Sequence, residues 1–102
     1  PACYGKGGTR AAITDANLLL GRVPERLVGG SFPLDAEASR KALTEVGASL
    51  GLDAEQVAFS ALEIAANNMA GAVREVSVRR GLDPRQYTLV AFGGAGPLHA
   101  CR

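Results

Sequence analysis

Three glycines near the end of the sequence have the spacing that most clearly allows chemistry. Gly93, Gly94 and Gly96 lie in the run GGAGP, after an apolar segment and before Leu98 and His99. Glycines in such a turn leave backbone N–H groups unshielded by Cβ atoms, so phosphate or nucleotide groups can approach them. The spacing is neither that of a P-loop nor the GxGxxG of a Rossmann fold. Spacing alone therefore leaves open a nucleotide contact and a tight turn in which glycine only permits positive φ.

Other polar residues carry weaker signals. The glycine-rich residues 5–9 include Lys6, and they can hold an anion or form a solvated surface loop. Asp15 and Asn17 flank a predicted helix start, where capping competes with a metal or substrate role. His99 has no nucleophile or carboxylate beside it in the sequence, which favours a structural role. This pattern assigns no catalytic residue and no metal ligand.

The elements that position these residues begin with a loop over residues 1–10, which are rich in glycine. A short helix is predicted over residues 14–20, with an N-cap hydroxyl at its start and Gly21 at its end. Residues 22–33 contain two prolines and a glycine pair, which exclude a long helix and predict a connecting loop.

Two longer helices are predicted next. The first covers residues 35–50, with Asp35 as its N-cap. A Schellman motif at Gly51 and Leu52 is expected to end it. The second covers residues 53–80 and begins with a predicted capping box. In this motif the side chains of Asp53 and Gln56 each accept a hydrogen bond from the other residue's backbone N–H. Its apolar stripe is Ala58, Leu62, Ala65 or Ala66, Met69, Val73 and Val76.

The segment before the GGAGP turn is the predicted strand. Residues 87–92 read YTLVAF, an apolar run typical of a buried strand, and a short helix is expected after Pro97. The predicted fold class is therefore mainly α with one short β-strand.

Composition narrows the class of protein. The chain has 102 residues, of which 47% are hydrophobic and 21% charged, as expected for one domain. A net charge of +1 gives no indication of a nucleic acid or membrane partner.

With no apolar run of roughly 18 residues and no leader pattern, a cytoplasmic protein is expected. Cys3 and Cys101 lack the spacing of a zinc site and are expected to be reduced thiols. The first residue, Pro1, and the last, Arg102, suggest a chain excised from a longer one.

Two blocks of the sequence resemble a known family. PACYGKGGTRAAITDANLLLGR and NNMAGAVREVSVRRGLDPRQYTLVAFGGAGPLHAC are similar to two segments of the hydantoinase A/5-oxoprolinase family. The helical stretch between them has matching order and length, so the resemblance covers residues 1–102. Lys6 replaces the usual arginine and keeps its charge, whereas Ala11 and Ala12 replace a Pro-Thr pair.

The resemblance implies a fold and an activity. Members are large cytoplasmic enzymes with an actin-like/sugar-kinase ATPase fold of the α/β class, and they open cyclic amides such as 5-oxoproline or hydantoins with ATP hydrolysis. Residues 1–102 would then be a single domain fragment, inactive when isolated, with Gly93, Gly94 and Gly96 near the adenosine and α-phosphate of ATP. Mg²⁺ would accompany the nucleotide in the intact enzyme. The implied partners are a small cyclic amide, the remainder of the parent chain and a hydantoinase B-type subunit.

Two alternatives remain at this point. One is a fragment of an ATP-dependent acetone or acetophenone carboxylase subunit, and the other is a non-catalytic helical interaction module. The sequence does not distinguish 5-oxoproline, hydantoin or a ketone as substrate, nor does it specify the metal or the oligomeric state.

Overall fold

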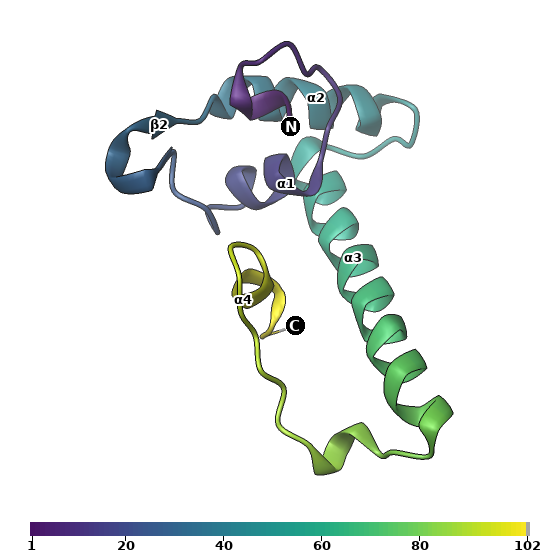
Figure 1. The fold of residues 1–102 in the computed structure, drawn as a ribbon. Coiled ribbons are helices and arrows are strands. Elements are labelled where there is room, and N and C mark those ends of the chain that lie inside the picture. Colours follow the sequence, from purple (N-terminus) through teal and green to yellow (C-terminus); the bar gives the residue numbers. More distant parts are fainter. Residues whose placement is uncertain (102) are drawn as a thin grey trace. The chain divides into compact units, whose positions relative to one another are not determined.

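The computed structural model describes residues 1–101, which are mainly helical and include a small two-stranded sheet (Figure 1). Arg102, the last residue of the predicted domain fragment, lies outside the described residues. Contacts divide the chain into two compact units, Pro1–Glu63 and Ile64–Arg102. The long helix α3 (Ala54–Ser77) contributes its first part to unit 1 and its second part to unit 2.

Unit 1 begins with short elements. In chain order they are the 3-10 helix η1 (Ala2–Tyr4), α1 (Ile13–Leu19), β1 (Arg26–Leu27), the 3-10 helix η2 (Val28–Gly30) and β2 (Phe32–Pro33). The helix predicted over residues 14–20 is confirmed, and Gly21 with φ +69° follows its end. Its predicted N-cap hydroxyl is wrong, because the N-cap is Ala12.

The loop predicted over residues 22–33 contains a small antiparallel hairpin instead of loop alone. Leu27 of β1 lies opposite Phe32 of β2, and Gly29 and Gly30 between them have φ of +63° and +96°. Glycine adopts such positive φ angles without steric cost, so the glycine pair can turn the chain back on itself. The prolines exclude a long helix here, but they are compatible with the end of a short strand.

Helix α2 (Ala36–Ala48) has the predicted caps. The Asp35 carboxylate accepts a hydrogen bond from the Ala38 N–H at 2.9 Å, which confirms it as the N-cap. At the other end the Leu52 N–H donates to the Gly47 carbonyl at 3.1 Å, and Gly51 has φ +68°. These are the features of the Schellman stop expected there.

Helix α3 begins with the predicted capping box. The Asp53 N–H donates to Gln56 Oε1 at 2.9 Å, and the Gln56 N–H donates to Asp53 Oδ1 at 2.8 Å. The α-helix ends at Ser77 and continues as the 3-10 helix η3 (Val78–Arg80). The long helix predicted over residues 53–80 is thus confirmed, apart from the tighter winding of its last turn.

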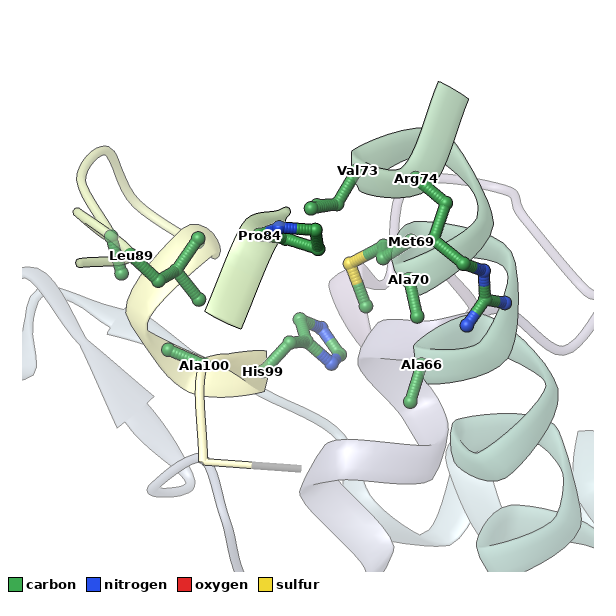
Figure 2. A pocket seen from close by; sticks show the side chains of 11 residues that line it. Ala66, Met69, Ala70, Val73, Arg74, Pro84, Leu89, His99 and Ala100 are labelled. Atoms are coloured by element: carbon green, nitrogen blue, oxygen red, sulfur yellow. The ribbon is translucent and has the colours of Figure 1, made fainter. Parts of the chain in front are cut away.

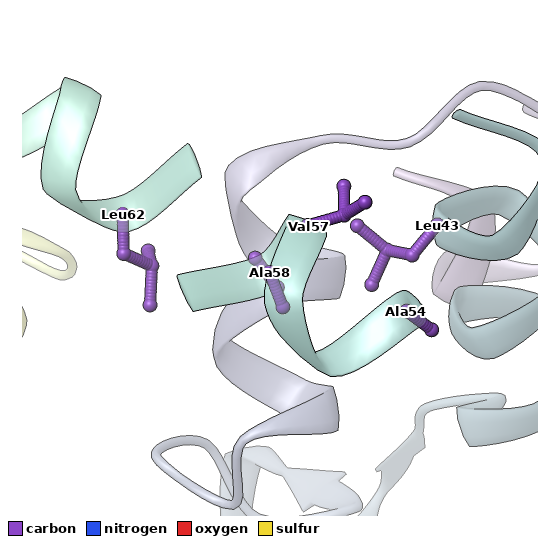
Figure 3. Close-up of a cluster of buried hydrophobic side chains, with 6 residues drawn as sticks. Leu43, Ala54, Val57, Ala58 and Leu62 are labelled. Carbon is purple, nitrogen blue, oxygen red and sulfur yellow. The ribbon is translucent and has the colours of Figure 1, made fainter. Parts of the chain in front are cut away.

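The hydrophobic core lies in unit 1. Its main cluster joins α1, α2 and the first part of α3, and Figure 3 shows this cluster from close by. The buried members are Ala16, Leu43, Ala54, Val57, Ala58 and Leu62. A second cluster contains Cys3, Leu18 and Leu34. The first part of the predicted stripe on α3 is therefore buried in this core.

Unit 2 holds the second part of α3, η3, the 3-10 helix η4 (Pro84–Gln86) and α4 (Gly96–His99). The short helix expected after Pro97 is confirmed. The buried strand predicted over residues 87–92 is wrong, because these residues are exposed and pair with no strand of the described chain. A strand needs a neighbour to bond its N–H and C=O groups, and the described part of unit 2 offers none.

Candidate functional site

The GGAGP turn places its three glycines on the surface, and they differ in their backbone. Gly93 has φ +86°, a left-handed conformation that explains glycine at that position. Gly94 and Gly96 do not have positive φ, and a Cβ built on either would meet no described atom within 4 Å. The conformation of the described chain therefore does not require glycine at positions 94 and 96. Their lack of a side chain leaves the turn's backbone open to a ligand.

A hollow of about 480 Å³ lies beside this turn within unit 2. Gly96 and His99 line it, together with small and apolar side chains of α3 and of the segment that follows (Figure 2). The α3 residues include Ala66 and Ala70, two of the small residues that the sequence places on this helix. Its walls are mainly apolar, and Arg74 is a charged residue on its border.

His99 supplies a polar atom at the hollow. Figure 2 shows its ring between α4 and α3, on the side of Met69 and Ala66. The ring nitrogen Nδ1 is buried and has no hydrogen-bond partner among the described residues. A buried polar atom without a partner is unfavourable, so this nitrogen is available to a ligand or to a group outside the described residues.

Asp15 is fully buried in unit 1 and anchors the start of the chain. Its carboxylate accepts hydrogen bonds from the N–H groups of Ala2 (3.1 Å), Cys3 (2.8 Å) and Ala12 (2.8 Å), and from the Ser39 hydroxyl (2.8 Å). Burial by itself raises the pKa of Asp15, but these hydrogen bonds outweigh it and hold the pKa below its usual value. Asp15 thus has the capping role that the sequence left open, because the Ala12 N–H is that of the N-cap of α1, and it also holds the start of the chain in place.

Ser39 and Cys3 belong to this buried cluster, although the sequence analysis gave neither a role there. Burial, followed by the neighbouring Asp15 carboxylate, raises the pKa of the Cys3 thiol to about 11. Ser39 falls on the apolar stripe of α2 near Ala42 and Leu43, which are also buried. A polar residue on an apolar stripe is the sequence signal that predicts such a buried hydrogen bond.

Asn17 is buried on α1, beyond the helix start that it was expected to flank. Its Nδ2 donates to the Ile13 carbonyl at 3.0 Å, and its Oδ1 has no partner among residues 1–101. The structure brings Asp15 and Asn17 together on one helix in unit 1, whereas the GGAGP turn belongs to unit 2.

The first glycine-rich segment is exposed, and its cation is engaged by an aromatic ring. Lys6 Nζ lies 5.3 Å from the centroid of the Phe32 ring, a cation–π distance. Tyr4 packs edge-on against the same ring, with centroids 5.3 Å apart. A separate hollow of about 270 Å³ in unit 1 is lined by Gly8 and Thr9, among other residues. These contacts fit the solvated loop that the sequence left as one alternative.

Cys3 and Cys101 are free thiols, as expected. Near the end of α3 and beyond it, Arg79 pairs with Glu75 at 2.6 Å and Arg85 with Asp83 at 2.9 Å. Residues 1–101 contain no cluster of three or more His, Cys, Asp or Glu side chains able to hold a metal ion. In the same part of the chain, no helix is both long and apolar enough to cross a membrane.

Known proteins match this chain over nearly its whole length. The profile of a family described as hydantoinase/oxoprolinase matches residues 1–102. An uncharacterised protein of Methanocaldococcus jannaschii is 46% identical over 99 residues, which are 97% of this chain and 15% of that protein. The acetophenone carboxylase gamma subunit of Aromatoleum aromaticum is 39% identical over 101 residues, which are 97% of this chain and 14% of the subunit.

A solved structure has the same fold. The ATP-dependent caprolactamase from Pseudomonas jessenii superposes with a TM-score of 0.89 at 38% identity, over 99% of this chain and 15% of that chain. The chain therefore spans about 15% of the length of the relatives it matches.

Proposed function

Because the chain belongs to the hydantoinase/oxoprolinase family, we propose that it is part of an ATP-dependent enzyme that opens a cyclic amide. In this proposal Gly93, Gly94 and Gly96 lie against the adenosine and α-phosphate of the nucleotide. The complete enzyme would have the actin-like ATPase fold that the family resemblance implies, and would act in the cytoplasm.

The observation that carries the proposal is the open backbone at Gly94 and Gly96. Neither residue has positive φ, and neither faces a described atom that a Cβ would touch. A ligand that approaches the backbone closely is a physical reason for glycine at such positions. The name of the relative with the same fold, an ATP-dependent caprolactamase, supports both the nucleotide and the cyclic amide.

Each part of the reaction needs groups that the GGAGP turn does not contain. Electrostatic stabilisation of a transferring phosphoryl group needs a metal ion and several converging donors. The turn contains no carboxylate, so Mg²⁺ would be held by residues elsewhere in the intact enzyme. We therefore assign the turn a binding role, and we expect the 102-residue chain to be inactive on its own.

A second candidate is a segment of an ATP-dependent carboxylase subunit. The observation that favours it is the 39% identity to the acetophenone carboxylase gamma subunit over 97% of this chain. Both candidates use ATP, so they share the role proposed for the glycines. That relative is named as one subunit of an enzyme, which supports a further subunit, such as one of the hydantoinase B type, as a partner.

The test is Gly94→Val in the intact enzyme. A Cβ at Gly94 meets no described atom within 4 Å, so we expect the fold to be kept, but the isopropyl group of valine would occupy space that the nucleotide needs. We expect the KM for ATP to rise at least ~10-fold, the equivalent of about 1.4 kcal/mol of lost binding. Gly71→Val is the matched control, since its Cβ also meets no described atom within 4 Å and it lies on α3.

Unchanged ATP kinetics in a correctly folded Gly94→Val enzyme would remove the assignment of the turn. Assays with a lactam and with a ketone plus bicarbonate separate the two candidate reactions. Ring opening of the lactam is expected, and ATP-dependent carboxylation of the ketone would favour the second candidate.

A further inference from the structure

We draw no further inference here: the strongest candidate, the apolar hollow of unit 2 between α3 and the GGAGP turn, which His99 lines, carries nothing beyond the site already described, because the chain spans about 15% of the length of its relatives and nothing in the structure shows what covers the hollow.

Discussion

The buried pair of Asp15 and Cys3 shows how two ionisable groups set the structure at the start of the chain. The Asp15 carboxylate accepts hydrogen bonds from backbone N–H groups on both sides of the glycine-rich loop, and the Cys3 thiol is buried beside it. Their pKa values move in opposite directions, lower for Asp15 and higher for Cys3. The fold therefore favours the charged carboxylate and the neutral thiol.

This difference predicts a stability profile with a fall at each end. The contribution of Asp15 is present above the ordinary carboxyl pKa of about 3.9 and is lost as the pH falls through its lower value in the folded chain. The contribution of the neutral Cys3 thiol is present below its ordinary pKa of 9.0 and is lost as the pH rises toward about 11. We expect the free energy of unfolding to fall by about 2 kcal/mol across this alkaline range through Cys3.

Urea denaturation at several alkaline pH values measures this loss. Cys3→Ala removes the titrating group, so its stability should change less with pH than that of the wild-type chain, although it is lower near neutral pH. Both chains carry Cys101→Ser, so that the exposed thiol does not contribute. Identical alkaline slopes in the two chains would contradict the role of Cys3.

The connection between α2 and α3 depends on one close backbone approach. Gly47 is buried near the end of α2, and a Cβ there would overlap the Leu52 carbonyl oxygen and lie 3.1 Å from Val57 Cγ2. The Leu52 N–H also donates to the Gly47 carbonyl, so the two residues are held together. Glycine at position 47 is thus required by packing rather than by its φ angle.

We predict opposite effects for two glycine-to-alanine changes. Gly47→Ala should lower the free energy of unfolding by about 1–3 kcal/mol or more, because a carbonyl of the backbone cannot move aside cheaply. Gly71→Ala on α3 should raise it by about 0.5–1 kcal/mol, since alanine favours the helix and meets no described atom within 4 Å. Thermal and urea denaturation measure both. A stable Gly47→Ala chain would show that α3 can shift away from α2.

Sequence reasoning succeeded where a structure depends on neighbours in the chain. The caps at Asp35 and Asp53 and the stop at Gly51 follow from local bonding, and all three are present. It failed over residues 87–92, because a strand is defined by a partner that lies elsewhere in sequence. At the candidate site the glycines were proposed from their spacing, whereas the hollow beside them depends on how α3 and the following segment pack.

At the scale of the whole molecule, the buried core belongs to one unit. Every described residue that is buried lies between positions 2 and 62, and residues 64–101 contain none. Hydrophobic burial is the main favourable contribution to folding. Unit 2 therefore gains little stability of its own, and α3 passes from a well-packed part into a part with exposed apolar side chains.

Native-state hydrogen exchange should resolve this difference along a single helix. Amides of residues 58–63 should open only with the core of unit 1, whereas amides of residues 70–77 should exchange at least ~10-fold faster through local opening. Leu62→Ala, which removes a fully buried side chain, should cost about 2–5 kcal/mol and speed exchange in the first group only. Equal protection along the whole of α3 would show that unit 2 is stabilised by contacts that burial does not reveal.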